Sequence, residues 1–128
     1  MRMTVIGCGY LGAVHAACMA ALGHDVVGID IDHDKVQALA SGRSPFHEPG
    51  LDEILAQGTA SGRLRFTAEP TAADLRGRGL HFITVGTPQA AGEGSADLSH
   101  LMCAVSMLVR LLDPDEGAVV VGKSTVPV

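Results

Sequence analysis

The sequence predicts an α/β fold in which helices cover both faces of a doubly wound parallel sheet. Segments with strand character alternate with segments with helix character from the first residues onward, as in parallel α/β units. The strand expected at residues 26–30 is apolar on both faces, which is typical of a parallel strand covered by helices on both sides. A glycine-rich turn joins the first expected strand to the first expected helix.

The expected strands are short apolar runs bounded by turn-forming residues. In chain order they are residues 3–7, 26–30, 64–67, 80–85 and 119–122. Two longer stretches between elements, residues 43–50 and 89–96, contain prolines or glycines and are expected to be loops.

The expected helices lie between these strands. They are residues 11–22, 33–40, 51–56 and 98–112, with a helical turn after Thr71. Gly23 suits the left-handed C-cap of the first helix, and Gly42 lies just past the second. The second helix is expected to begin near Asp32 or His33, and Asp97 is expected to be the N-cap of the last helix.

The composition excludes several kinds of partner. At 128 residues the chain is one domain in size, and we expect it to be part of a larger enzyme. Its net charge is -5 and only 3% of its residues are aromatic, which argues against nucleic acid. No apolar run reaches the roughly 18 residues of a membrane span, so no membrane partner is expected. The first residues leave no room for a signal peptide, which favours a cytoplasmic protein.

The three cysteines, Cys8, Cys18 and Cys103, are an odd and widely separated set. This pattern argues against a disulfide framework and indicates a reducing compartment. Each cysteine is expected to be a small buried apolar residue and not a nucleophile. Neither the cysteines nor the six histidines have a metal-ligand spacing, so no metal site is expected.

The turn after the first strand reads Gly-Cys-Gly-Tyr-Leu-Gly over residues 7–12, which is the pattern G-x-G-x-x-G. In a strand–turn–helix unit, Gly7 permits the tight turn, Gly9 lets the backbone approach a pyrophosphate, and Gly12 lets the helix pack on the strand. The helix N-terminus offers N–H groups and a positive dipole end to the anion. Glycines used only for turns and packing are the alternative, but ordinary turns do not need three at this spacing. The pattern therefore predicts a dinucleotide-binding Rossmann fold.

Asp30 stands at the end of the second expected strand, where a carboxylate can accept hydrogen bonds from the ribose hydroxyls of adenosine. A carboxylate there repels the 2′-phosphate of NADP, so NAD is the expected cofactor. Lys35 and Arg43 lie close enough in sequence to make this a preference. The alternative is that Asp30 only caps the following helix.

Four further segments extend the pattern beyond a general Rossmann domain. They are Glu-Pro-Gly-Leu at 48–51, Val-Gly-Thr-Pro at 85–88, Ala-Asp-Leu at 96–98 and Lys-Ser-Thr-Val-Pro-Val at 123–128. In this order, and together with residues 7–12, they resemble the UDP-glucose/GDP-mannose dehydrogenase family over the whole chain. The closing segment resembles the UDP-glucose branch of that family.

The resemblance implies an enzyme that oxidises the C6 alcohol of a nucleotide sugar to a carboxylate in two NAD-dependent steps, with a cysteine-linked intermediate. Members of the family have an N-terminal NAD domain, a central helix used in dimerisation and a C-terminal domain with the catalytic cysteine. We therefore expect residues 1–128 to be the NAD domain, truncated before the central helix and the C-terminal domain. The full-length enzyme is expected to bind a nucleotide sugar and to be a homo-oligomer.

The resemblance also assigns residues to the cofactor. They are Gly7, Gly9, Tyr10, Leu11 and Gly12 at the pyrophosphate, Asp30 and Lys35 at the adenosine ribose, Val85, Gly86, Thr87 and Pro88 in a loop over the cofactor, and Thr125 near the nicotinamide.

Thr125 is the one expected catalytic residue, because its hydroxyl can donate to an oxyanion or hold a water. Its alternative is a strand-end threonine bonded to backbone. Lys123 is interpreted as a solvated cation at a strand end, because nothing in the sequence marks an environment that lowers its pKa. The segment 48–51 is interpreted as a rigid turn, and Glu48 as a residue without a chemical role.

Three alternatives stay open. The substrate can be GDP-mannose or a UDP-N-acetyl-hexosamine, since those dehydrogenases look similar in this half. The chain can also be a non-catalytic NAD-binding module. Another Rossmann dehydrogenase, of a hydroxyacid or 6-phosphogluconate type, is disfavoured by the segments 85–88 and 123–128.

Overall fold

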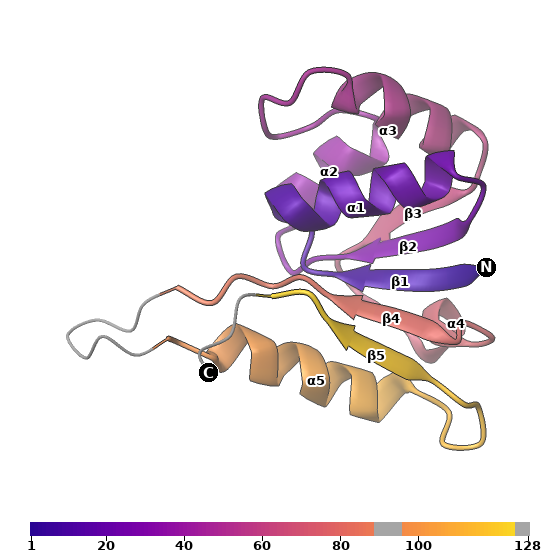
Figure 1. The fold of residues 1–128 in the computed structure, drawn as a ribbon, viewed down its shortest axis with the longest axis vertical. Helices are drawn as coiled ribbons and strands as arrows, with labels where there is room; N and C mark the ends of the chain where they lie inside the picture. Colours follow the sequence, from indigo (N-terminus) through magenta and orange to yellow (C-terminus); the bar gives the residue numbers. More distant parts are fainter. Residues whose placement is uncertain (89–95, 125–128) are drawn as a thin grey trace.

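The computed structural model describes residues 1–88 and 96–124. Its five strands form one parallel sheet in the order β3-β2-β1-β4-β5 (Figure 1). The strands are β1 (Arg2–Ile6), β2 (Asp25–Ile29), β3 (Leu64–Thr67), β4 (Leu80–Ile83) and β5 (Val119–Gly122). The chain runs outward from β1 to β3 and then returns to place β4 on the other side of β1. The predicted doubly wound sheet is thereby confirmed.

Helices cover both faces of this sheet, as the sequence predicts (Figure 1). The first face carries α1 (Tyr10–Ala21), α2 (His33–Ala40) and α3 (Leu51–Ala60). The second face carries the single turn α4 (Ala72–Leu75) and the longer α5 (Ser99–Leu111). Right-handed crossovers require this arrangement, because the two directions of winding place their helices on opposite faces.

Two hydrophobic clusters, one on each face, follow from the alternation of side chains along the strands. Met3 and Val5 of β1 join the cluster under α1 and α3, whereas Ile6 joins the cluster under α4 and α5. Four buried alanines of α1 meet the first face, so that α1 can lie close to the sheet: Ala13, Ala16, Ala17 and Ala20. Val26 and Val27 are both fully buried, on opposite faces, as expected for a parallel strand covered on both sides.

Most boundaries agree with the sequence, and the differences have local causes. Helix α3 extends four residues past its expected end, to Ala60. Its Gly58 lies buried against β3, where an added Cβ would be 3.1 Å from Leu64. Thr71 caps α4 in a reciprocal capping box with Asp74.

The expectation for Asp97 is wrong by one residue. The N-cap of α5 is Leu98, although the Asp97 carboxylate still accepts a hydrogen bond from the backbone N–H of Ser99 at 2.9 Å. An aspartate two residues before the first residue of the helix therefore satisfies one of its first N–H groups.

A buried arginine ties the crossover between β3 and β4 to the amino ends of two other strands. Arg78 is only 4% exposed. Its guanidinium donates to the carbonyl oxygens of Asp74, Met3 and Asp25, and to the Asp25 carboxylate at 3.0 Å. These bonds satisfy both the buried cation and carbonyl groups that water does not reach.

Replacing Arg78 with alanine should therefore lower the free energy of unfolding by about 2 to 4 kcal/mol, because the carbonyl groups lose their donor. Urea unfolding followed by circular dichroism measures the change. Arg76→Ala is the control, since Arg76 is exposed nearby and should change the stability by less than about 0.5 kcal/mol. Equal losses in the two variants would contradict this account of Arg78.

Candidate functional site

The carboxyl ends of all five strands lie at one edge of the sheet, and their loops meet there. Backbone hydrogen bonds continue the strand register into these loops: Gly7 N–H donates to Ile29, Thr84 N–H to Ile6, and Lys123 N–H to Ile83, each at 2.8 Å. The turns after β1, β4 and β5 are thus held beside one another. In open parallel sheets, this edge at the reversal of strand order is where ligands bind.

The glycine turn has the geometry that its sequence predicts. Gly7 has a φ of +92°, which favours glycine, and its position leaves no room for a side chain beside Val85. A Cβ on Gly12 would lie 1.9 Å from the Gly7 carbonyl oxygen and 2.6 Å from the Thr84 hydroxyl. The missing side chain at Gly12 therefore lets α1 begin directly on the turn.

Gly9 differs from its two neighbours in the motif. A Cβ built on Gly9 meets no atom within 4 Å among the described residues, and its φ of -65° suits any residue. Protein packing therefore does not explain the glycine. Gly9 is the N-cap of α1, and the first N–H groups of an α-helix have no partner within the helix. An open backbone at this point can accommodate an anionic group.

Asp30, directly after β2, is buried beneath the glycine turn. Its carboxylate accepts hydrogen bonds from Cys8 N–H at 2.7 Å, Asp32 N–H at 3.0 Å and the Lys35 ammonium at 3.0 Å. The cap of α2 is Asp32, whose carboxylate accepts from the N–H of Lys35, so Asp30 is not the N-cap. Asp30 and Lys35 are brought together as an ion pair at the edge where the sequence expects them.

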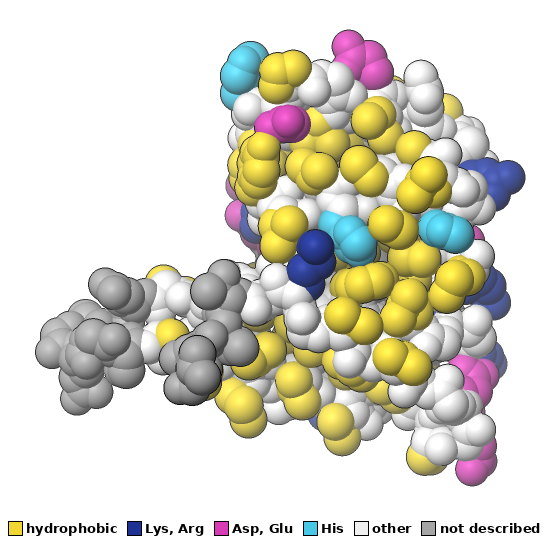
Figure 2. Space-filling view, viewed as in Figure 1, with side chains coloured by type: hydrophobic (Ala, Val, Ile, Leu, Met, Phe, Trp, Pro, Cys, Tyr) yellow, Lys and Arg dark blue, Asp and Glu magenta, His cyan; other side chains and the backbone are white. Residues whose placement is uncertain are grey.

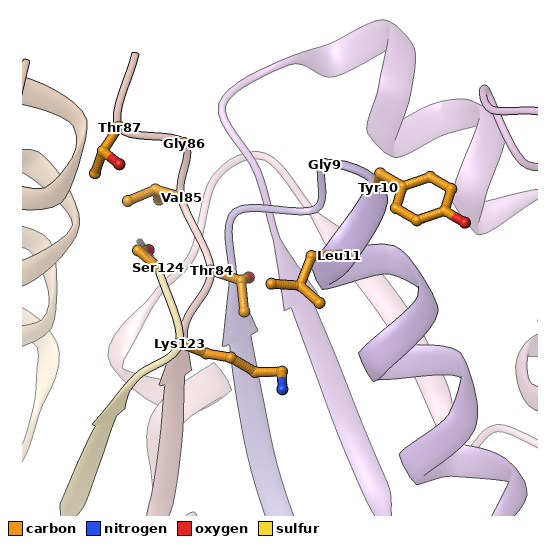
Figure 3. Close-up of a pocket in the computed structure, with 9 residues that line it drawn as sticks. All are labelled: Gly9, Tyr10, Leu11, Thr84, Val85, Gly86, Thr87, Lys123 and Ser124. Atoms are coloured by element: carbon orange, nitrogen blue, oxygen red, sulfur yellow. The ribbon is translucent and has the colours of Figure 1, made fainter. Parts of the chain in front are cut away.

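An open crevice of about 250 Å³ separates the glycine turn from the loop after β4 (Figure 3). Most of the residues that line it were expected from the sequence: Gly9, Tyr10, Leu11, Val85, Gly86 and Thr87. Thr84, Lys123 and Ser124 also line it. Among expected residues, Pro88 is exposed beyond the crevice lining, and Thr125 lies outside the described residues.

Sequence reasoning missed the role of Thr84. Its hydroxyl donates to the carbonyl oxygens of Gly7 at 2.6 Å and Ile6 at 3.0 Å, and so fastens the glycine turn to the end of β4. No motif marks this threonine, because the contact joins residues 77 and 78 positions apart. Lys123 is exposed, as expected, but its side chain lies along the crevice near Leu11 (Figure 3).

The structure also gives Glu48 a partner. The hydroxyl of Tyr10, the first residue of α1, donates to the Glu48 carboxylate. This bond raises the pKa of the Tyr10 hydroxyl, because the carboxylate favours the protonated phenol. Figure 3 shows the Tyr10 ring directed away from the other labelled residues. Tyr10 therefore lines the crevice with its backbone and not with its ring.

The expectation that all three cysteines are buried is wrong for two of them. Cys18 and Cys103 are exposed on α1 and α5, and only Cys8 is buried. Burial raises the pKa of the Cys8 thiol from 9.0 to about 12, and the nearby Asp30 carboxylate adds to the effect. In the part of the chain that the structure describes, no cysteine lines the crevice.

The described residues form neither a membrane-spanning helix nor a metal-binding cluster. No helix combines the length and apolar character that crossing a membrane requires. No group of three or more histidines, cysteines or carboxylates is placed to hold a metal ion.

The fold and the glycine turn define the class: this is a Rossmann dinucleotide-binding domain. Residues 1–128 match the model of the UDP-glucose/GDP-mannose dehydrogenase family, NAD binding domain, and the chain belongs to that family. NAD is accordingly its cofactor.

Individual relatives agree with this family. The chain is 46% identical to UDP-glucose 6-dehydrogenase of Rhizobium meliloti strain 1021 over 128 residues, which are 100% of the chain and 29% of the relative. It is 45% identical to GDP-mannose 6-dehydrogenase of Pseudomonas syringae pv. tomato over 101 residues, 79% of the chain and 23% of that relative. A UDP-glucose dehydrogenase structure from Pyrobaculum islandicum superposes with a TM-score of 0.89 and 42% identity, covering 98% of the chain and 29% of that structure. The chain thus spans less than a third of the length of these proteins.

The state of the three thiols offers a direct test of the site geometry. In the native protein, Ellman's reagent should label Cys18 and Cys103 at once, while Cys8 should react only after unfolding in urea. Because folding raises the Cys8 pKa above 9.0, the protonated thiol stabilises the fold below that pH, and this contribution is lost as the pH rises toward 12. Cys8→Ala is the control, and it should show the same two native thiols and no third. Rapid labelling of all three native thiols would contradict the burial of Cys8.

Proposed function

We propose that the chain is the NAD-binding half of an enzyme that oxidises the C6 alcohol of UDP-glucose to the carboxylate in two NAD-dependent steps. The observation that carries this choice is the 46% identity to a UDP-glucose 6-dehydrogenase. A GDP-mannose 6-dehydrogenase matches 98% of the chain at 42% identity, so coverage does not separate the two substrates and the preference rests on the difference in identity. GDP-mannose or a UDP-N-acetyl-hexosamine is therefore the alternative substrate.

The residues around the glycine turn fit a dinucleotide. We assign the pyrophosphate to the first N–H groups of α1, at Tyr10, Leu11 and Gly12, beside the open backbone of Gly9. No basic side chain is needed, because the helix dipole and the N–H groups together favour an anion. NAD, when bound there, accepts the electrons removed from the alcohol.

The adenosine ribose is assigned to Asp30 and Lys35. The Asp30 carboxylate is held by three donors and keeps acceptor capacity for ribose hydroxyls, since a carboxylate has about four lone-pair sites. Lys35 compensates part of its charge within the ion pair. A carboxylate at this point disfavours the 2′-phosphate of NADP, which supports NAD.

The opposite wall of the crevice is assigned to the nicotinamide half. Val85, Gly86 and Thr87 line the crevice across from the glycine turn. Thr125 follows Ser124, which also lines it, so we propose that the Thr125 hydroxyl serves the reacting end of the cofactor.

Exposed apolar side chains support a role for this domain beside further protein. The face in Figure 2 carries many hydrophobic side chains over the β4, β5 and α5 side of the molecule. Val119 of β5 is 60% exposed, and Val109 of α5 is 73% exposed. Apolar surface of this kind marks contacts with other protein, which is consistent with a substrate-binding half packed nearby and a homo-oligomeric enzyme.

The open space at Gly9 gives the first test of the cofactor site. Gly9→Val should keep the fold, because the backbone angles suit valine and no described atom is in the way. NAD affinity should fall by at least about two orders of magnitude, since the side chain would occupy the place of the pyrophosphate. Calorimetric titration measures the affinity, and urea unfolding checks the fold.

Gly117→Val is the matched control, because a Cβ there also meets nothing within 4 Å and the residue lies outside the crevice. It should bind NAD like the wild type. A folded Gly9→Val protein that retains its affinity would mean that the pyrophosphate binds elsewhere.

The substrate is tested by following NADH absorbance. The 128-residue chain should bind NAD and produce no NADH from UDP-glucose. The described crevice lining has no carboxylate or histidine to take the proton of the C6 hydroxyl in the first oxidation, and no thiol to attack the C6 aldehyde in the second. A polypeptide that also carries the catalytic half should oxidise UDP-glucose in preference to GDP-mannose. Preference for GDP-mannose would refute the substrate. NADH formation by the chain that survives Cys8→Ser, Cys18→Ser and Cys103→Ser together would refute the division into halves.

A further inference from the structure

Helix α1 begins without the usual device that fixes a first turn. In the described part of the chain, no side chain caps its Gly9 N-cap, and the first turn contains no acidic residue. Helix α2 is capped by Asp32 and the turn α4 by Thr71. Helix α3 also lacks a side-chain cap, but its first turn carries Asp52 and Glu53, whose charges favour a helix N-terminus. A side-chain cap on α1 would occupy the N–H groups that the proposed pyrophosphate needs. Its first turn therefore has to be held in another way.

The contact between Tyr10 and Glu48 meets this need from outside the helix. Tyr10 is the first residue of α1 and is 53% exposed, so burial does little to hold its ring. Its hydroxyl donates to Glu48, and its ring meets the edge of Phe46, with centroids 6.1 Å apart and planes at 73°. Both contacts act on the side chain and leave the backbone N–H groups of the first turn available.

The segment that carries Glu48 is itself anchored. Phe46 packs against the hydrophobic cluster under α1 and α3. Ser44 N–H donates to the Asp52 carboxylate at 2.6 Å, and Leu51 N–H donates to the Glu48 carbonyl at 3.2 Å. The segment of residues 44–51 is thus anchored on both sides of Glu48, and it holds the Glu48 carboxylate beside Tyr10.

We propose that Glu48 is a positioning residue for the cofactor, which fixes the first turn of α1 through the Tyr10 hydroxyl so that its N–H groups face the pyrophosphate. The proposal rests on the proposed pyrophosphate site. Glu48 is not among the residues that line the crevice. Its carboxylate acts as a hydrogen-bond acceptor, so an uncharged acceptor of the same shape should replace it.

The test is a double-mutant cycle on NAD affinity, measured by NMR titration, with urea unfolding of every variant. Tyr10→Phe and Glu48→Ala should each weaken NAD binding about three- to tenfold, the effect of losing one ordinary hydrogen bond. The double variant should be no weaker than the weaker single variant, because both changes remove the same bond. Glu48→Gln should restore the affinity to within about twofold, since the amide oxygen accepts from Tyr10.

Glu53→Ala is the matched control. Glu53 is exposed in the first turn of α3 and has the same charge, so its removal should change NAD affinity by less than about twofold. If Glu48→Gln binds as weakly as Glu48→Ala, or if Glu53→Ala weakens binding as much, charge is responsible and the proposal is refuted.

Other outcomes separate this proposal from the cofactor site. Additive losses in the double variant, or losses in unfolding free energy with unchanged NAD affinity, would give the pair a purely structural role and refute the positioning. If Gly9→Val abolishes NAD binding while Tyr10→Phe and Glu48→Ala bind NAD like the wild type, the pyrophosphate site is supported and the positioning role of Glu48 is refuted. Retained binding in Gly9→Val would overturn both.

Discussion

The contact between Gly12 and the carbonyl of Gly7 is the constraint on which the rest of the site depends. A side chain at Gly12 would collide with that carbonyl and with the Thr84 hydroxyl. Because it is absent, α1 starts on the glycine turn and lies on the sheet through its buried alanines. The axis of α1, and therefore the direction of its dipole, is fixed by packing before any ligand is present.

Asp30 also holds the glycine turn in place. Its carboxylate accepts from the N–H of Cys8, inside the motif, and from the ammonium of Lys35. The group proposed to bind ribose therefore also holds the pyrophosphate turn in place. A substitution at Asp30 must disturb both functions, whereas a substitution at the open Gly9 separates ligand binding from stability. For this reason Gly9 is the more informative position for assigning the site.

The sequence predicts the parts of this structure that depend on local rules. The strand order follows from alternation and handedness, and the caps at Gly23, Gly42 and Asp32 follow from backbone conformation and side-chain reach. Contacts between distant residues could not be predicted in this way. Thr84 and Glu48 carry no local signal, because each meets a partner at least 38 positions away. The exposure of Cys18 depends on which side of α1 faces the sheet, and a helix of alanines and other apolar residues does not reveal its buried side.

The uncapped start of α1 connects these observations. A helix whose first N–H groups serve a ligand cannot use them for its own stability, so that stability has to come from elsewhere. Here the missing Cβ of Gly12 brings the helix against the sheet, and the Tyr10 hydroxyl joins its first turn to the segment around Glu48. Neither device uses a backbone N–H of that turn. Helix α1 is thus stabilised by its packing on the sheet and by the Tyr10 side chain, and the N–H groups at its N-terminus stay available for the anion.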